Sequence, residues 1–187
     1  MIEGIILAGG KSSRMKQNKM LLPYLGKPLI YHTVQSMITY CNKITIVTGH
    51  YTEDYTSLFE SDNKVHIIHN DQYQLGMFSS IKKAIKDVNS NIFIIPGDYP
   101  LVSKTTYEKL IQGDGLIRVP VCSGRRGHPI FISHNLVLDL KNEDISSNLK
   151  VWRDKHEVNY IEVKDEGIYK DIDTVSEYRQ LLERTGS

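Results

Sequence analysis

The chain has few cysteines and almost no net charge. Its 187 residues include two cysteines, Cys41 and Cys122, which lie far apart without the spacing of metal ligands. We therefore expect neither a disulfide framework nor a zinc site, and we expect a reducing, cytoplasmic compartment. The formal net charge is +1. Because a nucleic-acid-binding surface normally shows as a basic excess, we expect small-molecule partners and no nucleic acid.

Long apolar runs are also missing. No stretch approaches the ~20 apolar residues that a membrane-spanning helix needs, and the N-terminus does not resemble a signal peptide. We therefore expect no membrane partner. The sequence contains no internal repeat, low-complexity run or linker. At this length, we expect a single domain over residues 1–187 with its own core.

Short apolar runs alternate with amphipathic segments of helical length. The continuous apolar character of the runs indicates strands that helices cover on both faces, which is typical of a mostly parallel sheet. We therefore predict an α/β fold. The expected strands are 2–8, 44–48, 67–69, 92–96, 116–121, 129–132 and 160–163, and the expected helices are 30–39, 79–88, 105–111, 148–155 and 175–183.

The first predicted strand leads into a glycine-rich, basic loop. Adjacent glycines let the backbone approach a ligand closely, hydroxyl and N–H groups donate to phosphate oxygens, and basic side chains supply positive charge. The spacing matches neither the Walker P-loop nor the dinucleotide fingerprint. By itself the segment fits either a nucleoside triphosphate site or an ordinary turn with solvated charges. Its candidate binding residues are Leu7, Ala8, Gly9, Gly10, Ser12, Arg14 and Lys19.

Acidic residues follow two of the predicted strands. Asp98 comes directly after an apolar strand, where it is either a Mg²⁺ ligand or part of an Asx turn. Asp171 and Asp173 alternate along an extended segment, so both point to one face. Thr174 and Glu177 have the spacing of a capping box, so we expect Asp173 or Thr174 to cap the last helix. Asp171 is then the preferred second metal ligand, and Asp173 is the alternative.

Two further segments could contact anions. Arg126, Gly127 and His128 lie in a loop between predicted strands, where the arginine suits an anionic substrate and the histidine either donates to a phosphate or is solvated. Gly76 and Ser79 precede a predicted helix, whose N-terminal N–H groups favour negative charge. That second segment could equally be only a helix start.

Taken together, five of these segments resemble the MobA-like nucleotidyltransferase family, and most closely its molybdenum cofactor cytidylyltransferase branch. The segments are 6–15 with Lys19, 75–81, 96–100, 126–129 and 171–174. Their order along the chain is that of the family. The chain departs from the family pattern at Lys16, where glycine is usual, and at Val175, where proline is usual.

The resemblance implies a three-layer, Rossmann-like fold of the nucleotide-diphospho-sugar transferase type. It implies transfer of a nucleoside monophosphate from CTP to the terminal phosphate of molybdopterin, with Mg²⁺ as cofactor and pyrophosphate as product. The implied catalytic residues are Arg14, Lys19 and Asp98. The nucleotide would lie on the glycine-rich loop, Gly76, Ser79 and Asp98, the acceptor near Arg126, Gly127 and His128, and the metal at Asp98 and Asp171.

Several alternatives stay open at this point. The same family includes guanylyltransferases that use GTP, and a sugar phosphate or another phosphorylated alcohol could be the acceptor. A molybdoenzyme or its chaperone is a further expected partner. A nucleotide-binding cofactor chaperone without turnover is the non-enzymatic alternative, and the two retained acids, Asp98 and Asp171, speak against it.

Overall fold

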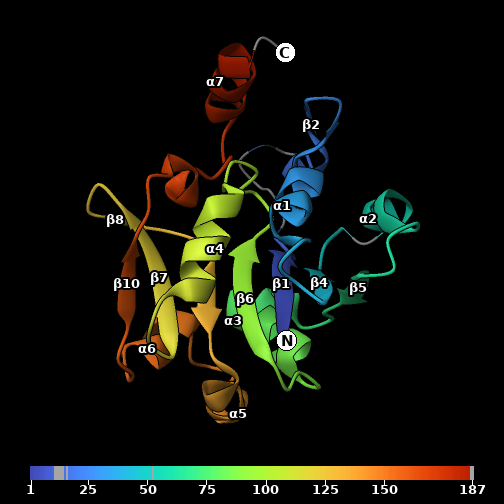
Figure 1. Cartoon of the computed structure of the whole chain (residues 1–187). Helices are drawn as coiled ribbons and strands as arrows, with labels where there is room; N and C mark the ends of the chain where they lie inside the picture. Colours follow the sequence, from blue (N-terminus) through green and yellow to red (C-terminus); the bar gives the residue numbers. More distant parts are fainter. Residues whose placement is uncertain (11–14, 16, 52, 186–187) are drawn as a thin grey trace.

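The computed structural model describes residues 1–10, 15, 17–51 and 53–185, and within these residues the fold is built on one large sheet. The strand order is β10-β7-β9-β6-β1-β4-β5, with β8 paired to β7. Neighbouring strands β6, β1, β4 and β5 are parallel, and β9 runs antiparallel between β6 and β7. The prediction of a mostly parallel sheet is therefore confirmed (Figure 1).

The strands and helices have the following bounds. The large sheet contains β1 (Ile2–Ala8), β4 (Lys43–Thr48), β5 (Val65–His69), β6 (Asn91–Pro96), β7 (Ile117–Cys122), β8 (Arg125–Arg126), β9 (Ile130–Ile132) and β10 (Asn159–Glu162). A small hairpin consists of β2 (Pro23–Tyr24) and β3 (Lys27–Pro28). The helices are α1 (Leu29–Met37), α2 (Glu53–Phe59), α3 (Met77–Ile85), α4 (Lys104–Gln112), α5 (His134–Asn142), α6 (Leu149–Arg153) and α7 (Val175–Thr185). Short 3₁₀ turns are η1 (Lys19–Leu21), η2 (Tyr73–Leu75) and η3 (Glu166–Tyr169).

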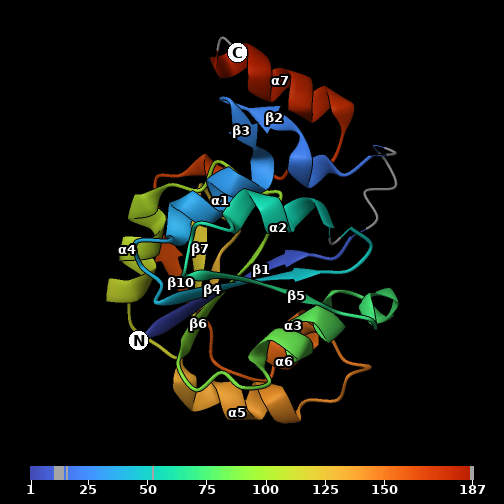
Figure 2. The same ribbon diagram turned by 90° about the vertical axis from the view of Figure 1, so that its right-hand side faces the viewer.

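Successive side chains of the central strand β1 enter two different cores. Ile6 and Ala8 pack with residues of α1, α2 and α4, whereas Ile5 and Leu7 pack with residues of α3, α5 and α6. Figure 2 shows these two helical layers on opposite faces of the sheet. Side chains of a strand alternate between faces, so a strand covered on both sides is apolar throughout. The structure thus confirms the predicted three-layer arrangement.

The sequence did not predict α2 and α5, which have few buried side chains among the described residues. In α2 the buried side chains include Tyr55 and Phe59, one helical turn apart, and in α5 they are Val137 and Leu140. Two apolar anchors do not establish a helical period, because the same spacing occurs by chance in polar segments. The predicted helix 79–88 starts and ends later in the chain than the observed α3, which spans Met77–Ile85.

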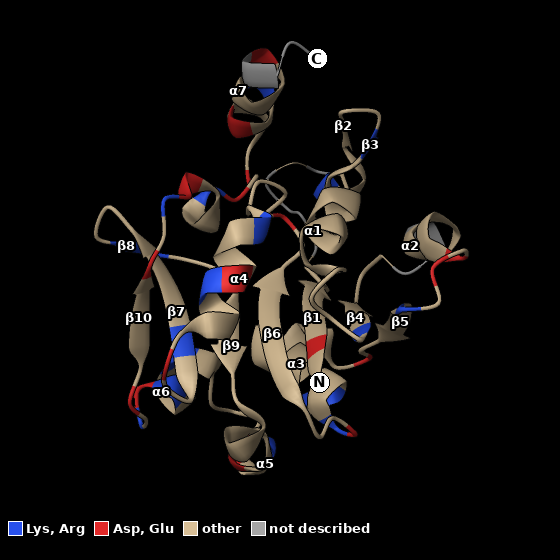
Figure 3. Ribbon diagram, in the orientation of Figure 1, with Lys and Arg blue, Asp and Glu red and all other residues tan. Residues whose placement is uncertain are grey.

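Charged residues of both signs are spread along the chain. Figure 3 shows Lys and Arg interspersed with Asp and Glu over the helices and loops. None of the helices in the described part of the chain has the length and apolar character needed to cross a bilayer.

The carboxyl ends of β1, β4 and β6 lie at one edge of the sheet, because these strands are parallel neighbours. Residues that follow these strands are thereby brought together.

Candidate active site

A cavity of about 480 Å³ lies at this carboxyl edge. Among the residues that the sequence analysis assigned to the nucleotide, those that line it are Leu7, Gly9, Gly10, Lys19 and Gly76. Asp98, Asp171, Asp173 and His128 line it as well. Five segments that are far apart in sequence therefore meet here, as expected for a ligand site at the ends of parallel strands.

Other candidate residues lie elsewhere or outside the described residues. Ser12 and Arg14 fall in the part of the first loop that the structure does not describe. Ala8 is in the core with α1 and α2, because its side chain points to the opposite face from Leu7. Gly127 is packed against the backbone of Ile168, where an added Cβ would lie 2.1 Å from the carbonyl oxygen. Its role in the structure is close backbone packing.

The cavity also contains residues that the sequence analysis did not select, namely Met20, Tyr73, Met77, Ser80, Pro96 and Tyr99. Gly49, after β4, is close to this wall: a Cβ there would lie 2.7 Å from the Gly9 carbonyl oxygen and 2.6 Å from Tyr73 Cβ. Only glycine allows β4, the glycine-rich loop and η2 to approach so closely. Its position directly after a predicted strand was the available signal.

Three carboxylates form a cluster at the floor of the cavity. Asp98, Asp171 and Asp173 each present an oxygen, and these three oxygens lie within 4.8 Å of one another. Lys19 Nζ donates to Asp98 Oδ2 and to Asp173 Oδ1. The other oxygen of Asp98, Oδ1, is buried and accepts no hydrogen bond within the described residues. A buried carboxylate oxygen without a donor, beside two further carboxylates, matches the hard oxygen ligands that Mg²⁺ prefers.

The charges in this cluster shift the pKa values of its members. Burial raises the pKa of Asp171, and the negative charges of Asp98 and Asp173 raise it further. Burial by itself lowers the pKa of Lys19, but the two neighbouring carboxylates, Asp98 and Asp173, outweigh this effect and the pKa is raised. Burial raises the pKa of Tyr99, and the charges of Asp171, Asp98 and Asp173 raise it further. Its hydroxyl therefore stays protonated at neutral pH. Within the described residues, three carboxylates are thus brought to one ammonium group, that of Lys19.

The capping box at the start of α7 frees Asp173 for this cluster. Thr174 N and Thr174 Oγ1 donate to Glu177 Oε2 at 2.8 and 2.9 Å, and Glu177 N donates back to Thr174 Oγ1 at 3.2 Å. Thr174 is thus the capping residue, which confirms one of the two predicted alternatives, Asp173 or Thr174. The Asp173 carboxylate faces Lys19 instead, so the structure brings both Asp171 and Asp173 to Asp98.

Asn70 fixes the wall formed by η2 and the start of α3. Its Oδ1 accepts from Gln72 N at 3.1 Å, so its Nδ2 must be the atom that donates to Ser79 Oγ at 2.9 Å and Ser80 Oγ at 3.0 Å. Ser79 Oγ donates in turn toward the carbonyls of Gln72 and Gly76, at 2.9 and 2.8 Å. Ser79 is therefore buried in the wall, and the neighbouring Ser80 lines the cavity.

His128 is neutral at physiological pH. Burial lowers its pKa to about 4, a hydrogen bond to the Ile94 backbone opposes this shift, and the Arg153 charge adds to it. Its ring lies 4.9 Å from the Tyr99 ring, centroid to centroid. The ring atom Nδ1 is buried and has no hydrogen-bond partner within the described residues. The histidine therefore offers the cavity a polar, uncharged ring and not a solvated cation.

Comparisons with known proteins identify the family of this chain. The family model of the MobA-like NTP transferase domain matches residues 4–158. The chain is 28% identical to the molybdenum cofactor cytidylyltransferase of Escherichia coli K12 over 186 residues, which cover 98% of this chain and 96% of that protein. It is 31% identical to a probable molybdenum cofactor guanylyltransferase of Thermococcus sibiricus over 123 residues, 63% of this chain and 60% of that protein.

Solved structures have the same fold. The protein Rv0371c of Mycobacterium tuberculosis superposes with a TM-score of 0.81 at 24% identity, covering 97% of this chain and 98% of that one. A nucleotidyl transferase from Methanothermobacter thermautotroptrophicus also gives 0.81, at 22% identity, covering 98% of this chain and 97% of that one. The family match spans most of the chain, as the sequence resemblance predicted. The chain belongs to the MobA-like NTP transferase family and is a nucleotidyltransferase.

Proposed function

We propose that this enzyme transfers the nucleoside monophosphate of CTP to the terminal phosphate of molybdopterin, in a reaction that requires Mg²⁺. The observation that carries the proposal is the acidic cluster, next to the glycine-rich loop and Lys19, in which the buried Asp98 Oδ1 accepts no hydrogen bond from any residue that the structure describes. The choice of CTP and of the acceptor is supported by the cytidylyltransferase relative, which matches almost the whole length of the chain.

The proposed reaction fits a site without a strong general base. An oxygen of the acceptor phosphate forms a bond to the α-phosphorus of the nucleotide, and the bond from this phosphorus to the bridging oxygen of pyrophosphate breaks. The attacking phosphate is already anionic, so no proton has to be removed from it. Catalysis then depends on aligning two anions and on neutralising the charge that develops. The cavity supplies groups for both tasks.

The residues have distinct roles in this proposal. Asp98, Asp171 and Asp173 would hold the divalent cation, which supplies positive charge to the phosphate oxygens. Lys19, which donates to Asp98 and Asp173, lies where its ammonium group can also reach a phosphate. Gly9 and Gly10 expose backbone N–H groups to the nucleotide, and Gly76 and Ser80 form the facing wall. Ser12 and Arg14 keep their proposed roles from the family resemblance.

GTP is the second candidate donor, because the Thermococcus relative carries the name of a guanylyltransferase at slightly higher identity over a shorter segment. In the proposed reaction the acidic cluster acts on the phosphates and not on the base, so it would serve either nucleotide equally. The described elements pack around one sheet, and we treat residues 1–187 as one catalytic domain in this proposal. A phosphorylated sugar or alcohol is the alternative acceptor class.

The test is a substrate panel. Purified protein is incubated with Mg²⁺, molybdopterin and each of the four nucleoside triphosphates, and pyrophosphate release and product mass are measured. We expect the largest rate with CTP, a product heavier than molybdopterin by one cytidylyl group, and no product in EDTA. A higher rate with GTP than with CTP would identify GTP as the donor. Turnover with sugar phosphates but not with molybdopterin would overturn the acceptor, and nucleotide binding without any turnover would favour the chaperone alternative.

A further inference from the structure

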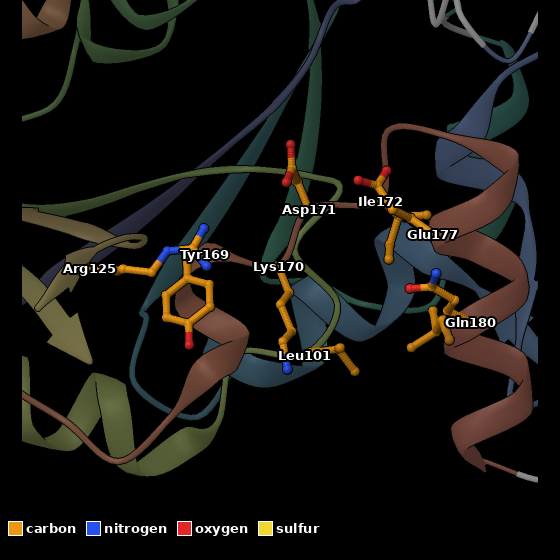
Figure 4. A pocket seen from close by; sticks show the side chains of 9 residues that line it. Leu101, Arg125, Tyr169, Lys170, Asp171, Ile172, Glu177 and Gln180 are labelled. Carbon is orange, nitrogen blue, oxygen red and sulfur yellow. The ribbon is translucent and has the colours of Figure 1, made fainter. Parts of the chain in front are cut away.

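A second cavity of about 290 Å³ adjoins the acidic cluster. It lies between η3, the β7–β8 hairpin and α7, and its lining includes Arg125, Tyr169 and Gln180 (Figure 4). Asp171 lines both this cavity and the nucleotide cavity. A ligand in the second cavity can therefore present a phosphate at the carboxylates that hold the metal in the proposed function.

The two adjacent arginines of β8 point to different partners. The Arg125 guanidinium lies 4.0 Å from the centroid of the Tyr169 ring, in the second cavity. The Arg126 guanidinium lies 4.4 Å from the Tyr160 ring on β10. Neighbouring side chains of a strand face opposite sides, so only one of the two can reach the acidic cluster. The sequence selected Arg126 for the acceptor, whereas the structure brings Arg125 to the side of Asp171.

The lining of this cavity suits a ring with polar edges. Leu101, Ile172 and Leu181 contribute apolar surface, and the exposed Gln180 contributes an amide that both donates and accepts. Lys170 is paired with Glu166, whereas Arg125 forms no ion pair with a carboxylate in the described part of the chain. The Arg125 charge is thus available to a ligand, and its planar fork matches the carbonyl or phosphate oxygens of a heterocyclic compound.

We propose that this second cavity, the Arg125 cavity, receives the ring-bearing body of the phosphorylated acceptor while the acceptor phosphate lies at the acidic cluster. This inference rests on the proposed function, because it takes that reaction's second substrate as its ligand. The Arg125–Tyr169 pair binds the heterocycle by its guanidinium and aromatic face, and Gln180 hydrogen bonds to its edge. The nucleotide stays in the larger cavity between the glycine-rich loop and Ser80.

The experiment compares two variants that differ only in which arginine is removed. Arg125→Ala should raise the KM for molybdopterin roughly tenfold, because a charge-assisted or cation–π contact is lost, and should leave the KM for CTP unchanged. Arg126→Ala is the matched control and should change either KM less than about twofold. Both side chains are exposed, so thermal melting curves of the two variants should superpose on that of the wild type. Arg125→Lys should restore part of the affinity.

A second readout does not depend on turnover. Molybdopterin is titrated into wild type, Arg125→Ala and Arg126→Ala without nucleotide, and the pterin fluorescence reports binding. Equal affinity in all three proteins, or no binding to the wild type, would overturn the Arg125 cavity. Failure of the proposed function looks different, because the wild type would then release no pyrophosphate with molybdopterin and any nucleotide. Failure of the inference alone leaves wild-type turnover intact and abolishes only the difference between the two variants.

Discussion

Two partly buried lysines in this fold have opposite surroundings. Lys82, on α3, donates to three backbone carbonyls of α5 and the residue after it, those of Leu140, Lys141 and Glu143. Lys19, at the carboxyl edge of the sheet, donates to the carboxylates of Asp98 and Asp173, with Asp171 close by. The Lys82 contacts satisfy the end of a helix with one positive charge. The Lys19 contacts are instead to negatively charged groups.

The difference separates a lysine that stabilises the fold, Lys82, from a lysine in the candidate active site, Lys19. At Lys82 every acceptor is a neutral carbonyl, so the interaction stabilises the fold and asks for no further ligand. At Lys19 three carboxylates gather around one ammonium group, and like charges at this separation oppose ionisation and folding. In the proposed function, a bound divalent cation would offset this repulsion. Substitutions in the two regions should therefore affect different measurements.

The largest effect is expected from Asp98→Asn. The amide keeps the shape of the side chain but removes the charge at the centre of the cluster, so the rate of pyrophosphate release at saturating CTP should fall by about 10²–10³-fold. The substitution removes a repulsive charge but also the ion pair of Asp98 with Lys19, so the shift in the midpoint of thermal unfolding should be small beside the loss of turnover. The measurement is turnover over a Mg²⁺ titration, together with a melting curve in EDTA.

Lys82→Met should show the opposite pattern, a loss of stability with little change in turnover. It removes a charge-assisted contact to the end of α5, which contributes about 1–2 kcal/mol, so the unfolding midpoint should fall by roughly 3–6 °C for a chain of this length. Turnover should remain within about twofold of the wild type, because Lys82 is not part of the cavity lining. A loss of turnover in Lys82→Met, or a loss of stability without a loss of turnover in Asp98→Asn, would contradict the distinction.

Two asparagines extend the same comparison, with expected effects of intermediate size. Asn70 holds Ser79 and Ser80 at the nucleotide cavity, whereas Asn91, at the start of β6, accepts from His134 N at 2.9 Å at the other edge of the sheet. Asn70→Ala should raise the KM for CTP about tenfold, with a smaller change in kcat, because Ser80 loses its fixed orientation and the wall loosens. The measurement is the steady-state KM and kcat for CTP.

The control for this prediction is Asn91→Ala. It removes one backbone contact at the start of α5, so it should cost about 1 kcal/mol of stability and leave the KM for CTP unchanged. Equal KM values for the two variants would mean that Asn70 has a purely structural role. A fall in stability for both variants is expected and decides nothing, so the KM for CTP is the deciding measurement.

The sequence predicted the acidic cluster better than the arginine side of the site. Asp98 could be found because it follows a strand, and parallel strands bring their carboxyl ends to one edge. Asp171 could be found because it alternates with Asp173 along the extended segment before the last helix. The choice between Arg125 and Arg126 could not be made in this way. It depends on the register of the β7–β8 hairpin, which the turn at Ser123 (φ 51°) and Gly124 (φ 75°) sets.

A similar limit applies to Ser79 and Ser80. Both lie in the first turns of α3 and both accept from Asn70, and a rotation of one residue on a helix decides that Ser80 and not Ser79 lines the cavity. The sequence places a serine pair before an amphipathic helix, but it does not show the hydrogen bonds that select between the two. Fold class and strand ends follow from local patterns, whereas side-chain direction at turns and helix starts follows from tertiary contacts.

The smallest expected effect concerns Asp171 and its pH dependence. Burial and the neighbouring acids, Asp98 and Asp173, raise the pKa of Asp171 above its ordinary value near 3.8. A carboxyl group with a raised pKa in the folded state stabilises the fold when protonated. That contribution is fully present below the unfolded-state pKa and is lost as the pH rises through the folded-state pKa. At neutral pH the ionised Asp171 therefore costs stability.

Asp171→Asn removes this cost at neutral pH. In EDTA at pH 7 its unfolding midpoint should lie about 1–2 °C above that of the wild type, a small shift because Asp171 is only partly buried and water screens its charge. The difference should disappear as the pH falls below 4, since Asp171 is then protonated in the wild type. Millimolar Mg²⁺ should stabilise the wild type more than the variant, because a cation that binds only the folded state raises its midpoint. A variant that melts below the wild type at pH 7 in EDTA would show that the Asp171 carboxylate stabilises the fold, and would place the metal-compensated repulsion at Asp98 and Asp173 alone.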